Sequence, residues 1–278
     1  MLKLRLLTLV ALVALIAGLN SCSKSDPNPA PAEQGLSQDL KARINALGFS
    51  SDEAYESDGG YIVEGDIFLS KEDLFSPAPE IQSLIVGNAE QYRTTLLVTG
   101  MPRTVRVWIN SGSGGNQLPP SYGQALDVAL GRYTAENLTL KFLRVGTSGE
   151  GEIDITKGNG NYLASAGFPT SAGNPYNSIK VNSNAIGNGS SNAFYDYVGS
   201  ILAHEIGHCI GMRHTDYMDR SYSCGGAYSN EGASSVGAIL IPGTPAGPDA
   251  NSWMLACISN LQNRPFNSND KTALSYLY

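Results

Sequence analysis

The stretch HEIGHCIGMRH, residues 204–214, decides how the rest of the chain is interpreted. On an α-helix His204 and His208 lie one turn apart on the same face, so both imidazoles can bind one metal ion while Glu205 reaches a water molecule beside it. Gly211 can end the helix in a left-handed conformation and bring His214 back as a third ligand. Three protein ligands leave a fourth position open for water, which is the arrangement of a catalytic zinc site.

The chain contains three histidines, and all of them lie in this stretch. Histidines that serve only for packing would not cluster in this way. A structural zinc site would need a fourth protein ligand, and Cys209 is the nearest residue of a suitable type. On a helix, however, Cys209 shares its side with Val198, Leu202 and Ile206, so we expect it in the core.

The full pattern, H-E-x-x-H-x-x-G-x-x-H, resembles that of the metzincin zinc peptidases, and its HEIGH spelling is similar to that of the bacterial dual-action HEIGH metallopeptidases. The resemblance implies an α+β, metzincin-like zincin fold, in which a mixed twisted sheet and the active-site helix lie above a loop-rich lower subdomain and a C-terminal helix. It also implies a methionine turn beneath the metal, and Met254 lies at the right distance. Residues 266–278 resemble the capped final helix of matrixins.

Two positions depart from the better-known branches of that family. Thr215 follows the third histidine, where Glu, Asp, Ser or Pro is usual, and Asp216 comes one place late. Astacins carry a tyrosine two residues after the methionine of the turn, and this position is Ala256 here. Any tyrosine that helps to stabilise the oxyanion must therefore come from elsewhere.

The N-terminus indicates export. Two basic residues precede an apolar run, residues 6–19, that is short for a membrane span but typical of a secretory signal. The run ends in Leu-Asn-Ser-Cys, which resembles a bacterial lipobox, so we expect a lipoprotein signal peptide over 1–21 and acylation of Cys22. Ordinary cleavage that leaves Cys22 as a free thiol is the alternative. The expected location is a bacterial membrane, with the lipoprotein exposed at the cell surface or in the periplasm and its release left open.

Composition and cysteine use agree with an exported protein. The net charge of −7 and the pI near 5.0 argue against nucleic acid as a partner. Beyond Cys22 three cysteines remain, which permits one disulfide and one buried thiol. We favour Cys224 with Cys257, because both lie in loop-like sequence flanking the site. No ligand pattern in residues 215–251 supports a structural Ca²⁺, and we expect a monomer.

Residues 22–95 are interpreted as a tether and a propeptide-like region, with a helix over 39–47, a strand over 61–69 and a second helix over 79–86. Within it, Val63-Glu64-Gly65-Asp66 resembles the F-x-G-D stretch of astacin prodomains. The resemblance implies that Asp66 binds the zinc in place of water and keeps the enzyme latent. A plain Gly-Asp bend beside a strand explains the same residues equally well.

Residues 96–278 are the expected catalytic domain, with an upper subdomain to about 211 and a lower subdomain over 212–278. A strand over 104–110, a helix over 122–137 and further strands over 138–145, 152–156, 162–166 and 177–181 predict a parallel pair within a mixed sheet. The helix that carries the motif should begin at Ser191 or Asn192. In the resembling family the edge strand above the zinc pairs with the substrate backbone, and the candidates here are Leu163, Ala164, Ser165 and Ala166.

The expected function is that of a zinc-dependent endopeptidase acting on protein or peptide substrates. Zinc held by the three histidines would lower the pKa of water toward ~7, and Glu205 would act as the general base. Two alternatives stay open. One is a lipid-anchored binding protein that no longer cleaves, and the other is a zinc hydrolase that acts on a non-peptide or cell-wall bond.

Overall fold

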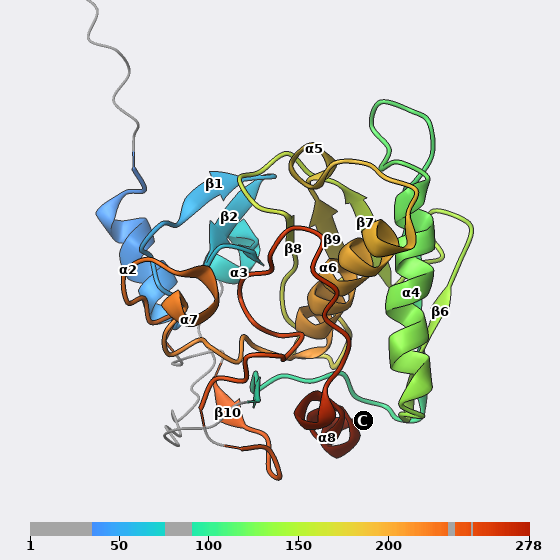
Figure 1. Ribbon diagram of the computed structural model, residues 1–278. Helices are drawn as coiled ribbons and strands as arrows, with labels where there is room; N and C mark the ends of the chain where they lie inside the picture. The colour runs from blue at the N-terminus through green and yellow to red at the C-terminus, as the bar shows by residue number, and fades with distance from the viewer. Residues whose placement is uncertain (1–34, 76–90, 233–236, 246) are drawn as a thin grey trace, which may run out of the picture. The chain divides into compact units, whose positions relative to one another are not determined.

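The computed structural model describes residues 35–75, 91–232, 237–245 and 247–278 (Figure 1). The chain divides into Met1–Gly35 and a compact unit, Leu36–Tyr278, and the description that follows concerns the second. Within this unit we call residues 36–75 the N-terminal segment and the described residues of 91–278 the body. Among the described residues, no helix combines the length and apolar character needed to cross a membrane.

A five-stranded mixed sheet is the centre of the body, with the strand order β6-β5-β7-β9-β8. Strand β5 pairs in parallel with β6 and β7, and the central strand β7 also pairs in parallel with β9. Only β8, at the edge, runs antiparallel to its neighbour. The expected α+β class and the parallel pair are therefore confirmed. The bounds are β5 Arg103–Ile109, β6 Leu140–Arg144, β7 Ile153–Lys157, β8 Ala164–Ser165 and β9 Ser178–Val181.

Two long helices, α4 (Ser121–Ala135) and α6 (Asn192–Ile210), lie side by side in front of the sheet in Figure 1. Ser191 caps α6 by accepting a hydrogen bond from the Phe194 amide. The two helices approach closely at Gly199, where an added Cβ would lie 2.9 Å from Val128. The core between helices and sheet is apolar and includes Val105, Val107, Ile155, Leu126, Ala129, Leu202, Ile206 and Cys209. Cys209 is thus a buried free thiol, as expected.

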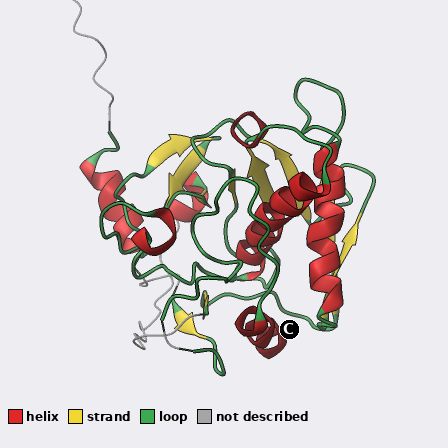
Figure 2. Cartoon of the chain, in the orientation of Figure 1, coloured by secondary structure: helices red, strands yellow, loops and turns green. Residues whose placement is uncertain are grey.

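Outside the sheet and the two long helices, the body is mostly loop (Figure 2). Its short elements are β4 (Tyr92–Arg93), α5 (Ser183–Ile186), α7 (Ser221–Cys224), β10 (Ile239–Leu240) and the final helix α8 (Ser268–Leu277). A disulfide joins Cys224 to Cys257, the pair favoured from the sequence. Asn267 and Asp270 form a capping box at the start of α8. The buried Asp270 also accepts hydrogen bonds from Gln91 and Ser252, which ties α8 to two distant parts of the chain.

The N-terminal segment is built from α2 (Gln38–Ala46), α3 (Lys71–Phe75) and a small antiparallel sheet, β1 (Tyr55–Ser57), β2 (Gly60–Val63) and β3 (Ile67–Leu69). The predicted single strand over 61–69 is wrong, because the chain turns back on itself between Val63 and Ile67. Glu64 (φ 54°) and Gly65 (φ 92°) both adopt left-handed backbone conformations there, and an extended strand excludes them. The helix predicted over 79–86 lies outside the described residues, as does Cys22.

Candidate metal centre

The C-terminal end of α6 places the three histidines. His204 and His208 lie one turn apart on the helix, which ends at Gly211 with a left-handed φ of 106°. Glycine is required at this position for a second reason, since an added Cβ would lie 2.8 Å from the carbonyl oxygen of Leu96. The Met212 amide then donates to the carbonyl of Gly207, and the chain returns with His214 beside the helix.

The three Nε2 atoms face one another at the centre of this arrangement. His208 Nε2 lies 2.9 Å from His204 Nε2 and 3.2 Å from His214 Nε2. Tetrahedral zinc with Zn–N distances of ~2.0–2.1 Å would separate its ligand nitrogens by roughly 3.3 Å. All three rings are buried. The spacing therefore suits a small cation that accepts nitrogen ligands.

The opposite ring nitrogens show which tautomer each histidine adopts. The Nδ1 atoms of His204 and His208 lie 2.8 and 2.9 Å from the carbonyl oxygens of Trp253 and Met212. His214 Nδ1 lies 2.8 Å from Glu231 Oε1. Because these partners only accept hydrogen bonds, the proton belongs on Nδ1, and the Nε2 lone pairs converge with no proton between them. A metal ion removes the resulting repulsion, so the donor set fits zinc.

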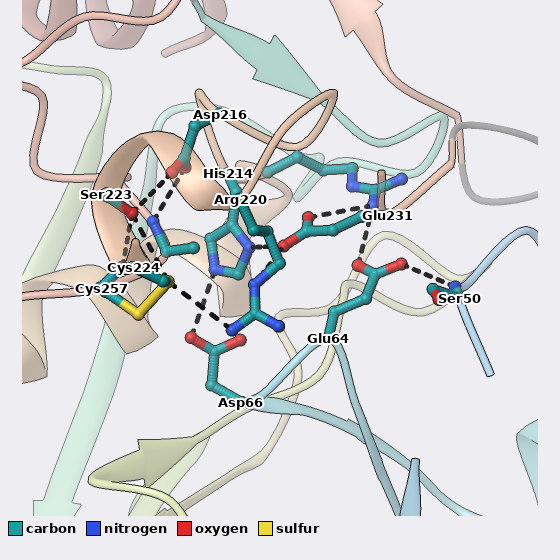
Figure 3. Close-up of polar contacts among 12 residues, drawn as sticks. Ser50, Glu64, Asp66, His214, Asp216, Arg220, Ser223, Cys224, Glu231 and Cys257 are labelled. Atoms are coloured by element: carbon teal, nitrogen blue, oxygen red, sulfur yellow. Dashed lines mark hydrogen bonds and ion pairs between the residues drawn. A yellow bond between two sulfur atoms is a disulfide. The ribbon is translucent and has the colours of Figure 1, made fainter. Parts of the chain in front are cut away.

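Asp66 supplies a fourth ligand atom to the same point (Figure 3). Its Oδ2 lies 3.2 Å from His214 Nε2 and 3.5 Å from His204 Nε2, and the four ligand atoms lie within 4.8 Å of one another. The turn at Gly65 brings the carboxylate there, and a Cβ on Gly65 would lie 2.5 Å from the Arg220 guanidinium. Burial alone would raise the pKa of Asp66, but the histidines, His214 above all, hold it well below its ordinary value.

Glu205 lies beside the metal-binding residues, and one oxygen of its carboxylate can still accept a hydrogen bond. Its side chain is buried, and its Oε2 has no hydrogen-bond partner among the described residues. Burial and the neighbouring negative charge of Asp66 raise the pKa of Glu205 well above its ordinary value, although His214 opposes the shift. A buried, unpaired carboxylate beside a metal position is what a general base for water activation requires.

Buried charges behind His214 form a network that sequence reasoning missed (Figure 3). Glu231 Oε1 accepts from His214 and lies 3.2 Å from Arg220 Nε, while Glu231 Oε2 lies 3.7 Å from Arg213. Arg213 also donates to Glu64 of the N-terminal segment at 2.9 Å. No spacing rule links residue 231 to the motif, because a loop carries it back to the site. The adjacency of Arg213 to His214 was the one available signal.

Met254, the methionine expected beneath the metal, packs against the same helix. An added Cβ on Gly207 would lie 2.6 Å from Met254 Sδ, so the methionine packs directly on the turn between His204 and His208. The Met254 carbonyl accepts from the Thr215 amide. Asp216, which comes one place late for the usual pattern, accepts from the amide of Ala256 and from Ser223. It thereby joins the chain after His214 to the chain after Met254.

A cleft of about 440 Å³ contains the site, and the predicted edge strand forms part of its wall. Leu163 and Ala164 line the cleft, and Ala166 follows them along the edge. The N-terminal segment pairs with this edge of the sheet. The Ala166 amide donates to the Asp66 carbonyl oxygen at 3.1 Å, and the Phe68 amide donates to the Ala166 carbonyl oxygen at 2.8 Å. The two chains run parallel at this bridge.

A protein-family model described as a dual-action HEIGH metallo-peptidase matches residues 61–278. Among solved structures, one titled as the structure of myroilysin has 15% sequence identity and a TM-score of 0.41, and covers 66% of this chain and 96% of its own. A second, titled as a crystal structure of myroilysin, has 14% identity and a TM-score of 0.39, with coverages of 66% and 86%. Comparison with curated proteins finds no match.

Proposed function

Because this chain belongs to the dual-action HEIGH metallopeptidases, we propose that it is a zinc endopeptidase held latent by its own N-terminal segment. Membership of the family makes it a zinc metallopeptidase with protein or peptide substrates. The observation that carries the latency is the carboxylate of Asp66, which points to the same position as the three histidine nitrogens.

In the proposed mechanism His204, His208 and His214 hold the ion. Bound by these three side chains, a zinc ion would polarise a carbonyl group and lower the pKa of water toward ~7. Glu205 accepts the proton of the attacking water on its unpaired carboxylate oxygen and delivers it to the leaving amine. Trp253, Met212 and Glu231 keep the histidines in the tautomer that binds metal.

Two features of the N-terminal segment support latency. Asp66 takes the position that water would need at a zinc ion with three histidine ligands. Asp66 O and the Phe68 amide also use both hydrogen-bonding groups of Ala166, which an extended substrate would need for strand addition. The segment therefore blocks the nucleophile and the substrate backbone together. This makes the N-terminal segment a propeptide in the proposal and the body the catalytic domain.

The test measures zinc content and casein cleavage on the chain that starts at residue 23. Wild type, Glu205→Gln and Asp66→Ala should each bind one zinc ion, since each retains the three histidines. Asp66→Ala should cleave at least ~10-fold faster than wild type, and the double variant Asp66→Ala/Glu205→Gln should lose ~10²–10⁴-fold of that rate. Equal rates for wild type and Asp66→Ala would refute the latency. Retained cleavage in the double variant would refute the role of Glu205.

We further propose that Cys22 carries a lipid that anchors the exported protein to a membrane. The Leu-Asn-Ser-Cys sequence after an apolar run supports this. An alkyne-tagged fatty acid should label the wild-type precursor in cells but not Cys22→Ser. Equal labelling of the two would refute the anchor. No observation favours the binding-protein or non-peptide alternatives, because the three histidines and Glu205 stand together in a peptidase family.

A further inference from the structure

The cleft continues along α6 beyond the metal ligands, toward the start of that helix. Its lining there includes Ser200, Ile201, Ile258 and Arg264. Ser200 precedes His204 by one helical turn, which corresponds to ~6 Å along the helix axis. A side chain of a bound peptide, next to the bond being cleaved, can span that distance. The residues around Arg264 are therefore placed to contact a substrate close to its scissile bond.

The backbone of Arg264 is fixed to the walls of the cleft. Its amide donates to Ser200 Oγ at 2.9 Å, and its carbonyl accepts from Arg132 at 3.2 Å. Arg132 in turn contacts Ser200, so the residue is held between α4 and α6. The position of Arg264 is thus set by two long helices of the body and does not depend on the N-terminal segment.

The guanidinium of Arg264 is buried, yet its hydrogen-bonding capacity is incomplete. The residue is only 7% exposed. Nη1 donates to the carbonyl of Cys257 at 3.0 Å and Nη2 donates to Gln262 Oε1 at 3.2 Å. Nε has no hydrogen-bond partner among the described residues. Both existing partners are neutral, so a positive charge lies in the wall of the cleft without a direct ion pair.

The two carboxylates whose charges act on Arg264 have other hydrogen-bond partners. Asp216 accepts from the Ala256 amide and from Ser223, and Asp270 accepts from Ser252, Gln91 and two backbone amides. Among the described residues, neither carboxylate has an oxygen within 4.0 Å of a guanidinium nitrogen of Arg264, so neither forms an ion pair with it. A buried cation without a paired anion is unfavourable, and a carboxylate offers the planar acceptor that a guanidinium matches best.

We propose that Arg264 is a specificity-determining residue that binds a carboxylate of the peptide substrate. The carboxylate is either the side chain of an Asp or Glu that flanks the scissile bond, or the C-terminus of a short peptide. Leu255 and Ile258 also line the cleft and limit water around the contact, which strengthens a charge-assisted hydrogen bond. The inference rests on the proposed peptidase function and names its substrate class.

The experiment uses the chain from residue 23 with Asp66→Ala as the parent, so that the cleft accepts substrate. Fluorogenic peptides with blocked ends carry Glu, Gln or Lys at each position that flanks the scissile bond. At one of these positions kcat/KM for Glu should exceed that for Gln by at least ~10-fold, a typical effect of a charge-assisted hydrogen bond. A second set compares a free C-terminal acid with its amide, which separates the two sources of the carboxylate.

Substitution of Arg264 in the parent then identifies the residue responsible. Arg264→Gln should bring the Glu/Gln ratio, or the acid/amide ratio, to about one. Arg264→Lys should keep the ratio above one but below that of the parent, because a compact ammonium loses the forked geometry. Arg144→Gln is the matched control, since Arg144 pairs with Asp127 on the surface and should leave both ratios unchanged.

The outcomes separate this inference from the proposed function. A parent that cleaves the peptides with both ratios near one overturns the role of Arg264 and leaves the endopeptidase standing. The role of Arg264 is also overturned if Arg264→Gln keeps the Glu/Gln or acid/amide ratio of the parent. A parent that cleaves no peptide while binding zinc refutes the proposed function, and this inference with it. If Arg264→Gln fails to fold, Arg264→Lys provides the test, and the parent's full ratio retained in Arg264→Lys would overturn the role of Arg264.

Discussion

The N-terminal segment and the body are stabilised in different ways. The body's core runs through both long helices and the five-stranded sheet. The segment has a small core of its own, formed by Ile44, Phe49, Leu74 and a few neighbours, and Phe168 of the body packs against it. A chain of about 40 residues rarely buries enough apolar surface to remain folded alone. The body can therefore keep its fold without the segment, whereas the segment depends on the body.

Buried polar contacts also join the two regions at the metal site. Glu64 reaches the buried Arg213, and Asp66 reaches the histidines. A buried ion pair stabilises little overall, but it strongly penalises a wrong position of either partner. The N-terminal segment therefore docks on the body in one defined position, and it can still leave that position without unfolding the body. The four predictions that follow test this difference, from the largest expected effect to the smallest.

One buried aromatic residue from each region gives the sharpest contrast. Trp253 packs on Phe266 and donates to Ala203 O, so Trp253→Ala should lower the free energy of unfolding by ~3–5 kcal/mol and abolish activity. Phe49 stacks against Phe168 and lies under the Arg213 guanidinium. Phe49→Ala should instead loosen the segment and raise casein cleavage. Urea unfolding and cleavage of both variants test this. If Phe49→Ala lowered both stability and activity as Trp253→Ala does, the two regions would not be separable.

Asp270 should make the stability of the body depend on pH. Burial raises the pKa of Asp270 to about 6, although Asn267, Ser252 and Trp253 donate hydrogen bonds that oppose the shift. The unfolded chain has a pKa near ~3.9, so the folded state binds more protons between the two values. The free energy of unfolding should then fall by roughly 3 kcal/mol as the pH rises from ~4 to ~6. Denaturation in EDTA measures it, and Asp270→Asn should remove this slope. An unchanged slope would contradict the assignment.

Glu231 should affect the affinity of the site for the metal. Glu231→Gln weakens the acceptor that orients His214, so zinc affinity should fall ~10–100-fold, or ~1.4–2.8 kcal/mol. Competition with a chromogenic chelator measures the affinity. Glu152→Gln is a matched control, because Glu152 pairs with Arg103 away from the site. Equal affinities for wild type and Glu231→Gln would show that the histidine keeps its orientation unaided.

We expect the smallest effect on cleavage and stability from loss of a solvent-exposed ion pair within the N-terminal segment. Lys71 and Glu56 lie 2.8 Å apart, with about half of each side chain exposed. Such pairs contribute little, so Lys71→Ala should change neither cleavage nor stability measurably. Glu64→Ala, by contrast, leaves the Arg213 charge buried without its partner in the segment and should raise cleavage. A clear gain in cleavage from Lys71→Ala would mean that surface charges also hold the segment.

Local sequence patterns were sufficient for most of the body. Helical spacing and Gly211 predicted where α6 ends, and alternating strands around a helix predicted the parallel part of the sheet. These features depend on residues close together in the chain. The turn at Glu64 and Gly65 entered only as a possible Gly-Asp bend, and one strand over 61–69 was predicted, since the alternating apolar residues around the turn suit one continuous strand. The left-handed conformation of Glu64 leaves no compositional signal.

Contacts between distant loops could not be predicted in the same way. Glu231 and Arg264 reach the site from loop sequence, and neither stands at a recognisable spacing from the histidines. Asp66 was suggested by a stretch of four residues that fitted a simple bend equally well. Only the three-dimensional arrangement brings its carboxylate within 3.5 Å of two of the histidines. Long-range geometry of this kind depends on the whole fold.

The connection of the segment and the body through one chain has a kinetic consequence. While the chain is intact, Asp66 and the histidines belong to one molecule, so dilution cannot lower the effective concentration of Asp66 at the histidines. A cut between Phe75 and Gln91 would make docking a reaction between two molecules, whose extent depends on concentration. If the released enzyme makes that cut in other copies, activation should accelerate as it proceeds, with a lag that shortens at higher protein concentration.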